Sequence, residues 1–196
     1  MNGVITLSLS EADDVEREVR RAAFREPYRT LLGHFRHEVG HFYWDLLVEQ
    51  TRLKTPFRLI FGDERQSYDA SLQNYHARTE RSYDRAGFIS EYATSHPWED
   101  WAETWAHYLH MVDTLETAAS FRLSINESVP TKPGLITYRA DMDFDTMLAE
   151  WTPLTCALNT INRSMGLSDL YPFIIPAPVT EKLKFIHRVI LENAKK

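Results

Sequence analysis

The chain has 196 residues, of which 43% are hydrophobic and 26% are charged, and its formal net charge at pH 7 is -6. This composition is sufficient for a globular core and lacks the excess of basic residues on which nucleic-acid binding depends. It contains no window of about eighteen apolar residues that could span a membrane, and its first residues lack the features of a signal peptide. We therefore expect a single domain over residues 1–196 with no nucleic-acid or membrane partner. The sequence leaves the oligomeric state open.

Cys156 is the only cysteine, so an intramolecular disulfide is excluded. This favours a reducing compartment, and we expect the protein to be cytoplasmic.

The N-terminal residues predict a strand followed by a helix. Residues 4–9 alternate in the way of a strand, which is either an edge strand that pairs with an extended substrate or an ordinary strand that covers the core. Residues 10–24 predict a charged helix, in which Ser10 and Asp13 resemble a capping box.

Residues 26–48 predict one long helix, with Pro27 near its first turn. Apolar side chains recur along it at steps of three and four, and we expect this stripe to anchor the helix in the core: Leu32, Phe35, Val39, Phe42 and Leu46. A polar stripe follows another face of the same helix: His34, His37, Glu38, His41 and Asp45.

The polar stripe contains the pentapeptide His37-Glu38-Val39-Gly40-His41. Histidines four residues apart lie on one face of a helix, so both can bind one Zn²⁺ while Glu38 lies beside the metal-bound water. Zinc lowers the pKa of that water from about 15.7 to about 7, and a nearby carboxylate can accept its proton as the hydroxide attacks a carbonyl. The pattern predicts a zinc-dependent hydrolase, although a chain with 8 histidines can also contain it by accident.

The next segment gives weaker signals. Residues 55–63 contain Pro56 and Gly62 and predict a loop with a short extended piece. Residues 67–80 predict a helix, and the loop from residue 80 to residue 88 can border the active-site cleft.

A second long helix is predicted from Pro97 onward. Its apolar side chains keep helical spacing: Trp98, Trp101, Trp105, Leu109, Val112 and Leu115. Small residues, Ala102 and Ala106, would let this helix approach Gly40 of the first helix closely.

The second helix also offers the third ligand that a catalytic zinc site requires in addition to an open fourth position. Glu99 and Glu103 lie one turn apart on one face. We favour Glu99 as the ligand over Glu103, which would then orient a ligand. The alternative is that Glu99 is an ordinary acid of a first helical turn and Glu103 a solvent-facing charge.

The signal weakens between residues 121 and 143. Residues 144–165 predict a helix with a break or kink near Pro153 and an end at Gly166, and residues 180–193 predict a closing helix. Taken together, the elements predict a mainly α fold with a small β element.

The two segments that carry the predicted ligands resemble known metallopeptidases. His37 to His41 followed by Glu99-Asp100-Trp101-Ala102-Glu103 resembles the gluzincin class. The Glu-x-x-Ala-Glu pattern, with Tyr92 seven residues before Glu99, is similar to the site of the anthrax lethal factor protease. Residues 28–44, 92–117 and 151–172 resemble the bacterial zinc-binding metallopeptidases that carry a zinc ribbon ahead of the peptidase domain. With one cysteine we expect no ribbon in this chain.

The resemblance implies a zincin-like catalytic domain that binds Zn²⁺ through His37, His41 and Glu99. Glu38 would be the general base and Tyr92 would donate a hydrogen bond to the oxyanion. In the gluzincin class an acid four residues after the ligand Glu orients a metal-bound His, which implies that Glu103 orients His37. The substrate would be a peptide or protein.

Two other functions fit the same residues. In the first, the metal only staples two helices together; Glu38 argues against it, because a structural site needs no base. In the second, an aromatic-rich helical module binds a partner and the histidine pattern is accidental. The metal content of the purified protein distinguishes the second from the others.

Overall fold

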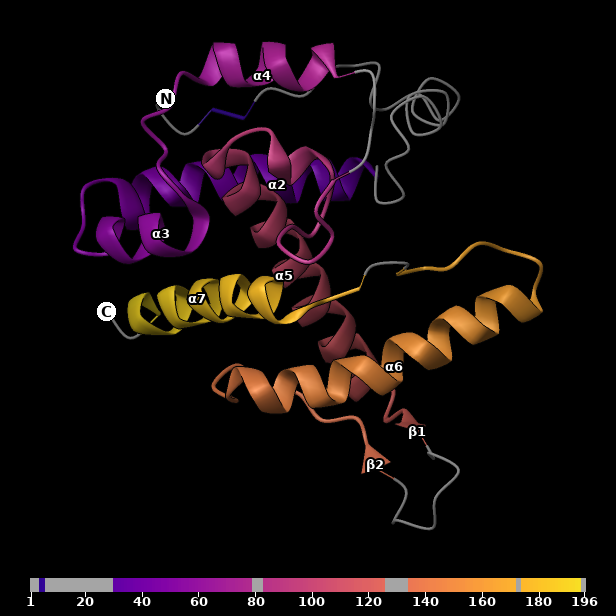
Figure 1. Ribbon diagram of the computed structural model, residues 1–196. Coiled ribbons are helices and arrows are strands. Elements are labelled where there is room, and N and C mark those ends of the chain that lie inside the picture. Colours follow the sequence, from indigo (N-terminus) through magenta and orange to yellow (C-terminus); the bar gives the residue numbers. More distant parts are fainter. Residues whose placement is uncertain (1–3, 6–29, 79–82, 126–133, 172–173, 195–196) are drawn as a thin grey trace. The chain divides into compact units, whose positions relative to one another are not determined.

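The computed structural model describes residues 4–5, 30–78, 83–125, 134–171 and 174–194. Within these residues the chain is mainly helical, as predicted (Figure 1). It forms two compact units, one from residues 1–108 and 174–196 and the other from residues 109–173. The single domain over residues 1–196 stays a prediction. The expected strand over residues 4–9 and helix over residues 10–24 lie almost entirely outside the described residues.

Helix α2, Leu31–Trp44, carries the histidine pentapeptide in the first unit. It begins later than predicted because Thr30 caps it: the backbone of Thr30 is extended, and its hydroxyl accepts a hydrogen bond from the backbone N–H of Gly33 at 2.8 Å. Pro27 therefore precedes the helix and lies outside the described residues. A π-helical turn, Asp45–Glu49, continues α2 at its C-terminal end.

Helix α3, Lys54–Phe61, replaces the loop that we predicted for residues 55–63, so that prediction is wrong. Helix α4, Tyr68–Ala77, agrees with the predicted helix over residues 67–80 and is capped by Ser67. A short 3₁₀ turn, Tyr92–Thr94, comes before helix α5, Pro97–Ser120, which starts at the proline as predicted. Helix α7, Ala177–Asn193, closes the first unit and begins a few residues earlier than predicted.

Helices α2 and α5 approach closely at Gly40, as the small residues on α5 predict. The indole nitrogen of Trp101 donates a hydrogen bond to the backbone oxygen of Gly40 at 2.8 Å. A Cβ atom added to Gly40 would lie 3.0 Å from Cα of Ala102 and 3.1 Å from Cβ of Trp105. Only a glycine allows this spacing, which places the polar face of α2 against the first turns of α5.

The apolar stripe of α2 does not lie in the core, which corrects our prediction. Val39 is half-buried, and four members of the stripe are exposed: Leu32, Phe35, Phe42 and Leu46. The buried positions of this helix are instead Gly33, Arg36, His37, Gly40 and Trp44. The face with the predicted ligands is therefore the one that packs inside the first unit.

A buried ion pair joins α7 to α5 beside this face. The ammonium group of Lys182 lies 2.6 Å from Oδ2 of Asp100 and donates to the backbone oxygen of Gly87 at 2.6 Å. The same ammonium group lies 4.2 Å from the ring centroid of Phe88. Lys182 thus ties α7, α5 and the segment before residue 90 together.

The second unit contains the C-terminal part of α5, a two-stranded sheet and helix α6, Phe144–Ser164. Strands β1, Ser124–Ile125, and β2, Gly134–Leu135, pair antiparallel, with Ser124 opposite Leu135. Helix α6 has no break at Pro153, contrary to one of the two outcomes we expected there. It ends before Gly166, whose φ of 79° is the left-handed conformation that glycine tolerates. None of the described helices combines the length and apolar character of a membrane span.

Candidate metal centre

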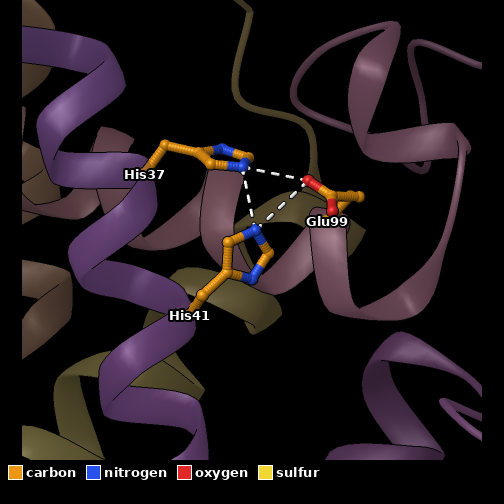
Figure 2. Close-up of side chains that lie close together, drawn as sticks. All are labelled: His37, His41 and Glu99. Carbon is orange, nitrogen blue, oxygen red and sulfur yellow. Dashed lines mark hydrogen bonds and ion pairs between the residues drawn. The ribbon is translucent and has the colours of Figure 1, made fainter. Parts of the chain in front are cut away.

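Three side chains in the first unit direct one donor atom each toward a common point (Figure 2). Nε2 of His37 lies 2.9 Å from Oε2 of Glu99 and 3.1 Å from Nε2 of His41. The third distance, from Nε2 of His41 to Oε2 of Glu99, is 3.4 Å. The two histidines extend from successive turns of α2, and Glu99 extends from the first turn of α5.

These distances fit a zinc ion. Ligands about 2.0–2.2 Å from a tetrahedral zinc lie roughly 3.3 Å from one another, close to the spacing of the three donor atoms. Two imidazole nitrogens and one carboxylate oxygen also form a donor set that zinc enzymes use. Glu99 is 1% exposed, and its Oε2 faces both imidazole nitrogens, so positive charge at this point stabilises the buried anion.

Glu103 lies on the other side of the His37 ring, away from the point where the three donor atoms meet. Its Oε1 lies 2.7 Å from Nδ1 of His37, and because a carboxylate only accepts, Nδ1 must donate. Nε2 of a neutral His37 then keeps its lone pair for a metal. The other oxygen of Glu103, Oε2, accepts a hydrogen bond from the hydroxyl of Ser90 at 2.6 Å. Glu103 therefore contacts His37 and Ser90 and is not one of the three residues whose donor atoms meet.

The electrostatics of the cluster also favour a cation. Burial alone would lower the pKa of His37, but Glu103 and Glu99 raise it to about 10. Burial would raise the pKa of Glu99, but His37 and His41 lower it well below its usual range. The carboxylate is therefore ionised, and positive charge is stabilised where the three donor atoms meet.

Glu38 is next to the first histidine and remains accessible, with a side chain that is 32% exposed. Its Oε1 lies 3.3 Å from Nε2 of His34, and this contact lowers the pKa of Glu38 more than burial raises it. Glu38 is therefore ionised and able to accept a proton, as a general base must be.

Tyr92 lies near the cluster. Its ring centroid is 5.8 Å from that of His37 and 5.6 Å from that of Tyr75. Burial, together with the charge of Glu99, raises the pKa of Tyr92, so the phenol keeps its proton. The neighbouring Tyr68 donates to Oε1 of Glu99 at 2.7 Å.

A cavity of about 470 Å³ opens beside the cluster. It has an aromatic wall formed by Trp44, Tyr68, His96 and Trp98, and charged side chains, among them Asp45 and Glu49, complete the lining. The ring of Trp98 lies close to that of His41, with centroids 3.9 Å apart and planes tilted by 40°, and Tyr68 contacts Glu99. The cavity therefore borders the cluster through Trp98 and Tyr68 and is not lined by the three candidate ligand residues themselves.

The sequence patterns did not predict that Tyr68, Ser90 and Trp98 contact the residues of this cluster. Tyr68 and Ser90 lie in segments with no motif, and they reach the cluster only through the packing of α4 and of the residues before α5. The one available signal was Ser67, a helix-capping residue directly before Tyr68, which predicts where α4 begins but not what it faces.

The fold and this cluster define a mainly helical protein with a His–His–Glu group suited to a metal. The chain belongs to the family described as "Putative zinc-binding metallo-peptidase", whose model matches residues 1–189. This agrees with the resemblance seen in the sequence.

Proteins with similar sequences are known, and their names state no activity. Proteins of Mycobacterium tuberculosis and Mycobacterium bovis, both named as uncharacterized, are 46% identical to the chain over 194 residues. The match covers 98% of this chain and 56% of theirs, so the chain spans about half the length of these relatives. No solved structure matches the chain.

Proposed function

We propose that the protein is a zinc-dependent metallopeptidase that hydrolyses peptide bonds in a peptide or protein substrate. The observation that carries the proposal is the convergence of His37, His41 and Glu99, with the ionised and accessible Glu38 next to the first ligand. Zinc in such a site supplies a bound water of lowered pKa and polarises a carbonyl oxygen. The single cysteine, which is exposed and free, supports a reducing compartment such as the cytoplasm.

The side chains of the chain would divide the remaining tasks. Glu38 would accept a proton as the scissile carbonyl is attacked and return it to the leaving amine. Glu103 would hold His37 in the orientation and tautomer that leave Nε2 for the metal. Tyr92 remains the candidate donor to the oxyanion, because burial and the charge of Glu99 raise its pKa and so keep the proton that it would donate.

The test is zinc content together with hydrolysis of a mixture of synthetic peptides by the purified chain. Glu38→Gln should keep zinc near the wild-type content, because Glu38 does not contact the three donor atoms. Its rate of hydrolysis should fall by at least about a hundredfold, the lower range for loss of a general base. Glu181→Gln, which removes the same charge from an exposed position on α7, is the matched control and should behave as the wild type.

The rival functions predict other results. Zinc bound in equal amount by the wild type and Glu38→Gln, with no hydrolysis by either, would favour a metal that only joins the two helices. A wild type that binds no zinc would contradict the metallopeptidase and favour a partner-binding module.

A further inference from the structure

Tyr68 is the first residue of α4, and its hydroxyl reaches across to α5. It donates a hydrogen bond to Oε1 of Glu99 at 2.7 Å. The other carboxylate oxygen, Oε2, faces both imidazoles. The two oxygens of Glu99 therefore have different partners, and the carboxylate cannot rotate about its axis without breaking the bond to Tyr68.

Water cannot readily replace this bond. Glu99 is 1% exposed, so an oxygen that lost Tyr68 would lack a hydrogen-bond partner in a buried place. Leaving such a group unpaired is costly, and most of all when the group is charged. The Tyr68 ring is itself held by neighbours, with centroids 5.4 Å from His96 and 5.7 Å from Trp98.

The Tyr68 hydroxyl has one proton, and this bond uses it. A phenol can donate a single hydrogen bond, and Tyr68 donates its own to Glu99. Loss of this hydroxyl would therefore remove the bond to Oε1 of Glu99 and no other donated bond.

We propose that Tyr68 is a positioning residue of the metal centre: its hydroxyl binds Oε1 of Glu99 and thereby restricts Glu99 to coordinating the metal through Oε2 alone. This deepens the proposed function and rests on the metal site named there. A catalytic zinc needs an open position, and a carboxylate with two free oxygens would compete for it. Tyr68 also forms part of the wall of the cavity that borders the cluster.

The experiment compares Tyr68→Phe with the matched control Tyr43→Phe. The Tyr43 ring stacks on Trp105 and takes no part in the cluster, so the control loses a hydroxyl without affecting Glu99. Zinc affinity is measured by competition with a chromogenic chelator. We expect Tyr68→Phe to bind zinc roughly ten- to a hundredfold more weakly, as for the loss of other groups that orient metal ligands. Tyr43→Phe should bind as the wild type does.

A second readout reports the coordination itself. Co²⁺ in a four-coordinate site absorbs visible light more strongly than Co²⁺ with five or six ligands. The Co²⁺-loaded Tyr68→Phe protein should therefore show weaker absorption bands than the wild type at full occupancy, because Glu99 can then use both oxygens. The Co²⁺-loaded Tyr43→Phe protein should show the wild-type spectrum, since its hydroxyl takes no part in the cluster.

The outcomes separate this proposal from the enzymatic one. Wild-type affinity and spectrum in Tyr68→Phe would overturn it, whatever the peptidase activity. Weaker zinc binding and an altered spectrum would support it even if no peptide is cleaved, in which case the proposed function alone fails. If circular dichroism shows that Tyr68→Phe is unfolded, Tyr68→Met, which also lacks the hydroxyl, decides: an unchanged Co²⁺ spectrum in that variant overturns the proposal.

Discussion

Four buried or half-buried ionisable side chains meet at the candidate metal centre, and residues outside the ligand group fix two of them. Glu103 holds Nδ1 of His37, Tyr68 holds Oε1 of Glu99, and the remaining donor atoms of His37, His41 and Glu99 face one another. A buried polar network becomes rigid when its members are hydrogen-bonded. The arrangement therefore depends on the residues around the ligands as much as on the ligands themselves.

Ser90 provides the first prediction at this scale. Its hydroxyl donates to Glu103, whose side chain is 21% exposed, so water can partly replace the lost bond in Ser90→Ala. We expect this variant to bind zinc several-fold more weakly, whereas Glu103→Ala should lose roughly ten- to a hundredfold. Titration with a competing chelator measures both. Ser120→Ala, at the exposed end of α5, is the control. Wild-type affinity in Glu103→Ala would show that Glu103 does not orient His37.

The sequence identified the residues of the cluster that belong to motifs and missed those that do not. His37, His41 and Glu99 could be proposed because helical periodicity places fixed spacings on one face. The favoured ligand, Glu99, does meet both histidines, and Glu103 contacts Nδ1 of His37 instead. Tyr68 and Ser90 could not be found, because only the packing of separate segments brings them to the two carboxylates.

At the scale of elements, the contact between α2 and α5 determines where the ligands meet. Gly40→Ala would place a Cβ atom 3.0 Å from Cα of Ala102, and this backbone atom cannot move aside cheaply. We expect a loss of about 1–3 kcal/mol in the free energy of unfolding, the usual cost of overpacking, and weaker zinc binding because the helices must separate. Chemical denaturation and a zinc titration measure the two effects.

The matched control for Gly40 is Gly166→Ala in the second unit. Gly166 has a φ of 79° and no atom within 4 Å of an added Cβ, so alanine there adds backbone strain without a clash. It should lower stability and leave zinc affinity unchanged. Equal zinc affinity in Gly40→Ala and the wild type would show that the helix spacing does not control the metal site.

Lys182 joins α7 to α5, and its loss leaves Asp100 without a cation. Breaking a buried ion pair on one side costs about 3–5 kcal/mol. Burial already raises the pKa of Asp100, although Lys182 lowers it, so the unpaired acid will take up a proton. We therefore expect Lys182→Met to lose about 3 kcal/mol, the lower end of the range. The double variant with Asp100→Asn should recover part of the loss in chemical denaturation. No recovery would mean that Lys182 acts mainly through Gly87 and Phe88.

Two predictions about helices, the loop over residues 55–63 and the buried apolar stripe of α2, were wrong for physical reasons. Pro56 and Gly62 suggested a loop, yet Pro56 lies in the first turn of α3, where a backbone N–H has no helical partner, and Gly62 follows the last turn with a φ of 104°. A proline in the first turn and a glycine just after the last turn are thus typical of a helix as well as of a loop. The apolar stripe of α2 was expected inside, but the polar face is buried because it packs on α5 at Gly40. Periodicity gives the two faces of a helix and does not by itself decide which one is buried.

At the scale of the whole molecule, zinc should stabilise the fold, because the three residues proposed to bind it lie on two helices that are distant in the sequence. A ligand at a hundred times its dissociation constant adds about 2.7 kcal/mol to the free energy of unfolding. For a protein of this size, that corresponds to roughly 5–10 °C in the thermal midpoint. We expect a chelator to lower the midpoint of the wild type by this amount and to have no effect on His41→Ala. An equal shift in both proteins would place the stabilising metal elsewhere.

The link between α2 and α5 has a consequence for the amount of protein in a cell. The indole of Trp101 and the backbone oxygen of Gly40 are separated by 61 residues, and the proposed metal would close the same long segment. A loss of about 2.7 kcal/mol raises the unfolded fraction roughly a hundredfold, and unfolded chains are the ones that cellular proteases degrade. When zinc is scarce, this protein should therefore be cleared faster, and its abundance would report the zinc supply.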